Sequence, residues 1–212
     1  MLRKAFSMLA VPVILLTSCG QSASVDFTNP YTVVGTKYNQ YFELRAEELL
    51  AALNETVGDD APQLEIMDSG HERTTYFTLN GETWKLLLHV FSDDDISTLS
   101  VASGDQTQWI GYIKEIELSL YSDSEETALQ NGTYLRALIS IFAPGAEEKV
   151  EDALGIYDDP EKSAAITDGV TRAICGTVAF SYVDGDSFLV TPYDEALHEK
   201  LSETPPSVIA PD

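Results

Sequence analysis

The sequence predicts an α+β fold, an antiparallel sheet of four to six strands with helices packed on one face. Two observations predict it: Asn80-Gly81 joins two alternating apolar runs, and residues 125–142 have apolar side chains at helical spacing. Asn-Gly is the strongest short-range hairpin signal, because a type I′ turn needs a positive φ at both central residues. Antiparallel sheets commonly have one apolar face, and an amphipathic helix is suited to cover it.

Alternation of apolar and polar residues predicts strands in four parts of the chain. They are a hairpin at 74–79 and 82–91, single strands at 96–102 and 109–121, and a hairpin at 177–183 and 187–191. In the first hairpin we expect Phe77 to face Trp84 and Thr75 to face Leu86. This side of the hairpin is assigned to the core.

In the strand at 109–121, one face is expected to be apolar and the other solvated. Ile116 and Leu118 belong to the apolar face, and Ile113, Glu115 and Glu117 belong to the other. Paired carboxylates can hydrolyse glycosides, but these two acids are explained as part of a regular polar face.

Helical spacing predicts helices at 45–54, 125–142, 146–154 and 194–201. Ser122 and Glu125 form a candidate capping box for the second of these. Gly132 lies inside the same helix and costs up to about 1 kcal/mol, so we expect a kink or close packing there. Pro144 and Gly145 end it.

The beginning of the chain has the order of a bacterial export signal. Arg3 and Lys4 precede an apolar run at 5–16, and two small residues follow. Spanning a bilayer takes about 20 apolar residues, so this run is too short for a stable membrane span.

The run Leu16-Thr17-Ser18-Cys19 resembles the lipobox of bacterial lipoproteins, in which an aliphatic and two small residues precede a cysteine. The resemblance implies that Cys19 becomes the first residue of the mature protein and carries a diacylglycerol on its thiol. It also implies a location at the extracytoplasmic face of the cell membrane. Two acyl chains anchor stably, since each buried CH₂ contributes about 0.8 kcal/mol. The alternative is an ordinary secretory signal with a coincidental cysteine.

The chain divides into four predicted segments. Residues 1–18 are the signal peptide, 19–35 the lipidated cysteine and a flexible tether, 36–201 a single α+β domain, and 202–212 a loose tail.

Twelve basic and 35 acidic residues give a net charge of −23. Such a surface repels phosphate backbones and anionic lipid headgroups, so we expect no nucleic acid partner and no direct binding to a lipid surface. The acidity has two explanations: solubility outside the cytoplasm, which we favour, or attraction of cations and basic partners.

Local motifs for metal binding or catalysis are absent from the sequence. Three acidic clusters offer the oxygen ligands that Ca²⁺ prefers, but none has the spacing of a calcium loop, and each is explained as a turn or helix cap. The clusters are Asp93 with Asp94 and Asp95, Asp158 with Asp159 and Glu161, and Asp184 with Asp186. His71, His89 and His198 lack the spacing of zinc ligands. No nucleophile frame and no phosphate loop occurs.

Cys175 is the only free thiol if Cys19 is lipidated. Its sequence neighbours are apolar or small and include no histidine, so we predict a small buried hydrophobe and not a nucleophile. Ten tyrosines, among them Tyr31, Tyr38 and Tyr41, are explained as strand residues or, alternatively, as an aromatic recognition patch.

These observations predict a non-catalytic binding or assembly protein, anchored through Cys19, with no cofactor. Its expected partner is an envelope protein or a small ligand. The alternative is an envelope hydrolase whose catalytic residues lie far apart in the sequence. A cleft with converging polar groups would favour the hydrolase, and an exposed apolar or tyrosine-rich patch would favour the binding protein.

Overall fold

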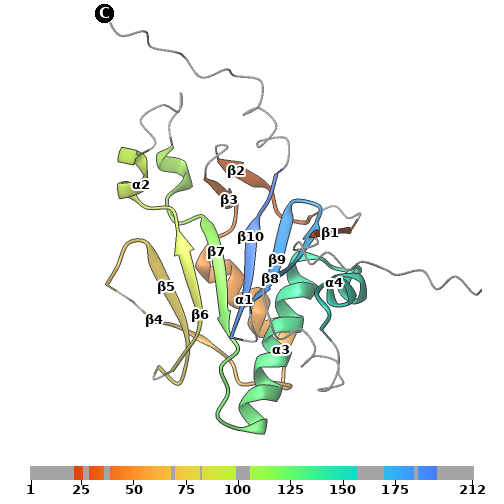
Figure 1. Cartoon of the computed structure of the whole chain (residues 1–212). Coiled ribbons are helices and arrows are strands. Elements are labelled where there is room, and N and C mark those ends of the chain that lie inside the picture. Colours follow the sequence, from red (N-terminus) through yellow and green to blue (C-terminus); the bar gives the residue numbers. More distant parts are fainter. Residues whose placement is uncertain are drawn as a thin grey trace, which may run out of the picture.

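One sheet of ten strands runs through the computed structural model, with the longer helices on one of its faces (Figure 1). The structure describes residues 22–25, 29–35, 39–67, 70–81, 83–98, 106–156, 170–183 and 186–194. The α+β class is confirmed. The expected number of strands was too low, because four short strands precede the first predicted hairpin and another precedes the last one.

Eight strands follow one another in the order β1-β8-β9-β10-β7-β6-β5-β4, and β2 and β3 form a hairpin that joins β7. Every strand pair is antiparallel except the parallel pair of β1 and β8. The strands are β1 Ser22–Val25, β2 Val33–Gly35, β3 Gln40–Phe42, β4 Glu65–Met67, β5 Thr74–Leu79, β6 Thr83–Val90, β7 Ile113–Ser119, β8 Val170–Cys175, β9 Val178–Val183 and β10 Ser187–Pro192.

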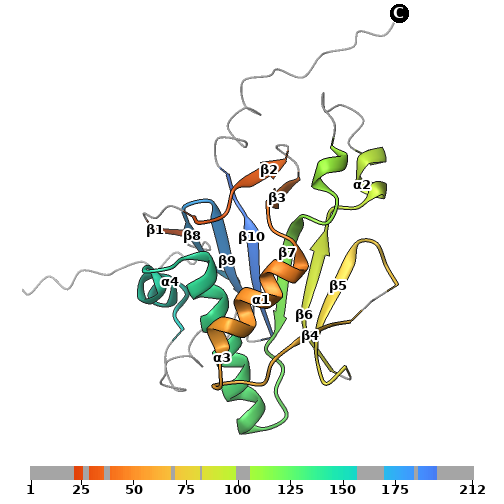
Figure 2. The ribbon, with the colours of Figure 1, turned by 180° about the vertical axis from the view of Figure 1, so that it is seen from behind.

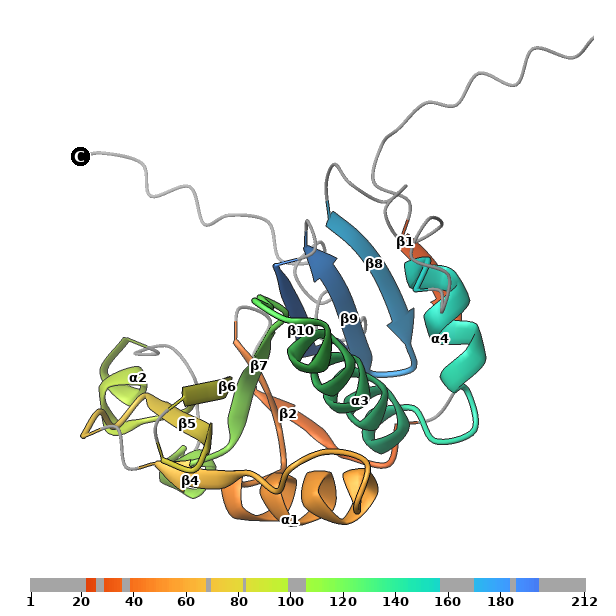
Figure 3. The same ribbon diagram turned by 90° about the horizontal axis from the view of Figure 1, so that it is seen from below.

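Helices α1 (Ala46–Val57), α3 (Glu125–Phe142) and α4 (Glu147–Leu154) cover one face of the sheet (Figures 2 and 3). Their apolar sides and the inward side chains of the sheet form one core, which includes Leu49, Leu53, Phe77, Leu86, Leu88, Ile116, Leu118, Leu138, Phe142, Phe180, Phe188 and Val190. The prediction of helices packed on one face of the sheet is therefore confirmed for α1, α3 and α4.

The second predicted helix has the predicted bounds, because its buried positions recur at helical spacing. Its N-cap is Ser124, whose Oγ accepts a hydrogen bond from the backbone N–H of Thr127 at 3.1 Å. The expected capping box of Ser122 and Glu125 is wrong by two residues. An added Cβ at Gly132 would meet nothing closer than the Arg136 side chain at 3.9 Å, so close packing does not explain this glycine.

The Asn80-Gly81 hairpin is confirmed, with φ values of 54° and 71° at its two turn residues. Its predicted register is wrong, since Phe77 pairs with Leu86 and not with Trp84. Next to the turn, the observed pairing differs from the predicted one by one residue. A bulge in β6, opposite Phe77 and Thr78, shifts the pairing by one residue more. As a result Trp84 is 43% exposed instead of lying in the core.

A second bulge changes which residues of β7 face the core. Val90 pairs with Ile113 and His89 pairs with Glu115, so Lys114 is the extra residue. Ile113 is therefore buried like Ile116, whereas we expected it on the polar face.

The strand predicted at 96–102 is wrong where the structure describes it. Helix α2 (Asp93–Thr98) ends within this range and occupies its first three positions, and a single turn of 3-10 helix (Thr107–Trp109) precedes β7. Three aspartates occupy the first turn of α2, where the helix dipole favours negative charge. The Asp95 carboxylate also accepts hydrogen bonds from the backbone N–H and the hydroxyl of Ser92, at 2.9 and 3.1 Å.

Strands β1 and β2 lie within residues 19–35, where we predicted a flexible tether. Residues Ser22–Val25 pair with β8, so the tether prediction is wrong for this part. Small side chains do not prevent such pairing, because the ladder of a sheet joins backbone groups. The helix expected at 194–201 and the tail at 202–212 lie outside the described residues, apart from Asp194.

Candidate functional site

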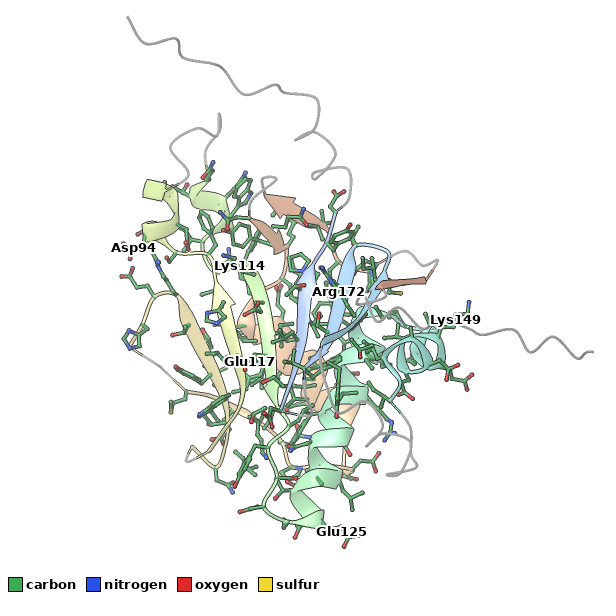
Figure 4. All side chains as sticks on the ribbon, viewed as in Figure 1. Asp94, Lys114, Glu117, Glu125, Lys149 and Arg172 are labelled. Atoms are coloured by element: carbon green, nitrogen blue, oxygen red, sulfur yellow. The ribbon has the colours of Figure 1, made fainter. Side chains whose placement is uncertain are left out.

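The face of the sheet opposite the helices, here called the open face, carries the candidate site (Figure 4). Its residues alternate along each strand with buried ones such as Phe77 and Leu118. One row of paired residues crosses it from β4 to β8: Met67, Tyr76, Leu87, Glu117, Leu189, Ser181 and Arg172.

An aromatic patch, formed by Met67, Tyr76 and Trp84, lies at the β4 end of this face. The rings of Tyr76 and Trp84 are 6.2 Å apart, and Met67 and Trp84 are 37% and 43% exposed. Leu87, the register partner of Tyr76, extends the apolar surface toward β7. Large aromatic side chains left exposed together are typical of a binding surface, because they bury much area at a small cost in conformational entropy.

A polar pocket of about 330 Å³ lies where the end of β6 and the start of β7 meet α2. Its lining residues are Arg73, His89, Val90, Asp95, Lys114 and Glu115. Within it, His89 Nε2 is 3.6 Å from Glu115 Oε1, and Arg73, which also lines it, forms an ion pair with Asp94 of α2, Nη2 to Oδ2 at 3.2 Å. Because all four side chains are partly exposed, water weakens these attractions.

Both the bulge in β7 and helix α2 position this pocket. The bulge brings Lys114 and Glu115 together beside His89, which pairs with Glu115 across the strands. Beneath α2, the ring of the buried Tyr41 packs at 4.9 Å from Phe91. Burial raises the pKa of the Tyr41 hydroxyl, and the nearby Asp95 carboxylate raises it further.

The pocket combines a histidine and a carboxylate with two cationic side chains. Glu115 can orient the His89 imidazole as a general base, and Arg73 and Lys114 can attract an anionic group. No group of three or more histidine, cysteine, aspartate or glutamate side chains suited to a metal ion occurs in the described parts of the chain.

Lys85 and Asn131 form a buried polar pair on the other face of the sheet. Lys85 is 7% and Asn131 2% exposed; Lys85 Nζ donates to Asn131 Oδ1 at 3.2 Å, and Asn131 Nδ2 donates to the Tyr121 carbonyl at 3.1 Å. Burial lowers the pKa of Lys85, while Asp123 acts in the opposite direction. Lys85 is the extra residue of the bulge in β6. The only sign of this bulge in the sequence is the run of three leucines after Lys85, which interrupts the alternation of apolar and polar residues.

The two cysteines have different outcomes. Cys19 lies outside the described residues, so lipidation stays a prediction. Cys175 is fully buried, as predicted, and burial raises the pKa of its thiol to about 11.

The other candidate residues are only partly brought together. Asp95, His89 and Glu115 meet at the polar pocket, although they come from different segments, and Asp94 pairs with Arg73 of its lining. Glu117 instead accepts a hydrogen bond from the Ser187 hydroxyl at 3.0 Å. His71 is exposed and outside the pocket, Asp186 lies in an exposed turn, and Tyr31 packs on Phe142. Tyr38, Asp158, Asp159, Glu161, Asp184 and His198 lie outside the described residues. Sequence reasoning missed Arg73 and Lys114, because no local spacing relates them to His89.

The fold and this site define an α+β protein with an open sheet face. The chain matches no model of a protein family, and neither a curated protein nor a solved structure is significantly similar to it. Within the part that the structure describes, no helix is long and apolar enough to cross a membrane.

Proposed function

We propose that this chain is a lipid-anchored protein of the extracytoplasmic membrane face that binds an envelope protein through the open face of its sheet. The lipobox at Leu16 to Cys19 supports the anchor. The aromatic patch supports the binding role and is the observation that carries it. Interfaces are enriched in exposed tryptophan, tyrosine and methionine, and these residues often dominate the binding energy.

The polar pocket beside the patch suits the rim of such an interface. Met67, Tyr76 and Trp84 offer an apolar centre, and the charged side chains around His89 lie toward the other end of β6 and on the neighbouring β7. This arrangement of an apolar centre and a polar rim is typical of protein interfaces. The partner is expected to be neutral or basic where it meets the domain, because the chain carries a net charge of −23.

A photo-crosslinking amino acid at position 84 tests the binding role in intact cells. The matched control is the same amino acid at Leu129, which is 70% exposed on α3 at the helix-covered face. We expect a discrete protein adduct from position 84 and none from position 129. Equal adducts at both positions, or none at position 84, would contradict the proposal.

The anchor has its own test. Intact mass of the protein extracted from membranes should show the diacylglyceryl addition, and Cys19→Ala should accumulate as an unlipidated, uncleaved chain. An unmodified mature chain that begins elsewhere would refute the anchor.

A hydrolase is the second candidate, and the contact of His89 with Glu115 in the polar pocket favours it. In that case His89 is the general base, and His89→Gln removes hydrolysis of envelope extracts while thermal stability is kept. If the purified mature chain shows no turnover, or if His89→Gln turns over equally fast, this candidate is wrong.

A further inference from the structure

We infer that the β1 edge of the sheet lies against the membrane surface and that the aromatic patch is held at the membrane-distal end. The inference rests on the proposed lipid anchor at Cys19. Its structural basis is that β1 begins only three residues after that cysteine and is paired into the sheet.

The short chain between Cys19 and β1 limits the distance from the anchor to the edge of the sheet. Three residues from Cys19 to Ser22 span at most about 11 Å when fully extended. Ser22 pairs with Arg172 of β8, and neighbouring strands are about 4.8 Å apart. The backbone at Arg172 therefore lies within about 16 Å of the anchored residue, and the domain is unable to float freely above the bilayer.

The order of the strands sets the distance from the β1 edge to the aromatic patch. Seven strand spacings separate β1 from β4, which corresponds to about 34 Å measured along the sheet. Figure 3 shows the two strands at opposite ends of the curved sheet. The aromatic patch lies on β4, β5 and β6, so it belongs to the end far from the anchor.

The charges around β1 indicate the kind of membrane surface that fits. Arg172 lies over the Tyr193 ring at 5.4 Å, and no ion pair joins it to a carboxylate in the described residues. Helix α4, which contacts β1 and β8, carries Lys149, which Figure 4 shows pointing outward, among four acidic residues: Glu147, Glu148, Glu151 and Asp152. A zwitterionic headgroup layer offers phosphates to the cations and ammonium groups to the acids, whereas a strongly anionic layer repels the acidic chain.

Short-range fluorescence quenching tests this orientation on the lipidated mature chain in phosphatidylcholine vesicles with a headgroup-attached quencher. A dye is placed at Asp152→Cys on α4 or at Met67→Cys on β4, and Ile66→Cys gives a second distal position. The buried Cys175 leaves the introduced cysteine as the reactive thiol. We expect position 152 to lose most of its fluorescence and positions 66 and 67 to keep theirs. Equal quenching at both ends would overturn the inference.

A variant with a longer link between Cys19 and β1 tests whether the short link causes this orientation. Fifteen Gly/Ser residues inserted after Gln21 add a reach of roughly 20 Å, so quenching at position 152 should be lost. Unchanged quenching would show that the short link does not set the orientation, against the inference. Flotation separates the two proposals: a chain that does not float with vesicles refutes the anchor, whereas a chain that floats with equal quenching refutes only the orientation.

Discussion

Replacing Asn131 with alanine removes the partner of a buried lysine. In the native protein Asn131 Oδ1 accepts from Lys85 Nζ, and Asn131 Nδ2 donates to the Tyr121 carbonyl. Alanine offers neither group, and the Lys85 ammonium is then left in the helix–sheet interface without this acceptor. We expect Asn131→Ala to be one of the more destabilising single changes on α3.

The size of the effect follows from the two hydrogen bonds. A hydrogen bond to a charged group contributes about 1.5–3 kcal/mol, and a neutral one about 1 kcal/mol. The first of these bonds joins two buried side chains, and the second, to the Tyr121 carbonyl, is partly buried, so it is counted only at the neutral value. The expected loss in the free energy of unfolding is about 2.5–4 kcal/mol, which for a domain of this size lowers Tm by about 5–16 °C.

The penalty depends on pH in a defined direction. Burial lowers the pKa of Lys85 in the folded state below its ordinary value of 10.5. At pH values between this lowered pKa and 10.5, the unfolded chain binds more protons than the folded chain. The free energy of unfolding therefore rises with pH in this range. Losing the Asn131 oxygen lowers the pKa further, so the Asn131→Ala penalty should shrink as pH rises toward 10.5. Lys85→Met should abolish this rise, because methionine carries no charge.

Urea unfolding followed by circular dichroism from pH 7 to 10 measures these differences. Each variant is compared with the parent at the same pH, because tyrosines with raised pKa, such as Tyr134 at about 12, titrate in both proteins. Leu129→Ala, at an exposed position of the same helix, is the control and should change stability by at most about 0.5 kcal/mol. If Asn131→Ala behaves like this control, or its penalty is the same at all pH values, the reasoning is wrong.

Three further predictions concern single residues. Cys175 should react with a thiol reagent only as fast as the protein unfolds, because its thiol is buried and its pKa is about 11; rapid labelling without denaturant would contradict this. Gly35→Ala should lower the free energy of unfolding by about 1–3 kcal/mol in urea titrations, since Gly35 has a φ of 129° and an added Cβ would meet the Asn39 carbonyl; an unchanged midpoint would refute the strain. Tyr134→Phe should cost about 1–3 kcal/mol in the same assay, because its hydroxyl donates to the Pro62 carbonyl at 2.6 Å; a neutral effect would show that this hydrogen bond is dispensable.

The sequence predicted the elements whose signals are local. The helix at 125–142 was found with its bounds, because Leu135, Leu138 and Phe142 recur at helical spacing on its buried side. The first hairpin was found because Asn80-Gly81 favours the backbone angles that the turn has. In both cases the residues that specify the structure are neighbours in the chain.

Pairing between distant segments was not predictable in the same way. The three leucines after Lys85 break the alternation of β6, but a bulge depends on the partner strand, so the sequence did not say that Lys85 lies inside and Trp84 outside. The polar pocket joins Arg73, His89 and Glu115 from three strands or turns, and its position depends on the second bulge. The aromatic patch was missed for the same reason, since it requires the true register of the hairpin.

The parallel pair of β1 and β8 also has a consequence for the order of folding. Ser22 pairs with Arg172, and these two residues are 150 positions apart in the sequence, from 22 to 172. During synthesis β1 emerges from the ribosome first, and its partner strand β8 follows only after most of the chain. Such distant contacts form slowly, because the entropy of closing the loop is lost before the contact stabilises it. We therefore expect the hairpins of β5–β6 and β8–β10 to form early and β1 to be the last strand added, so that the edge nearest Cys19 stays unpaired until the rest of the sheet is complete.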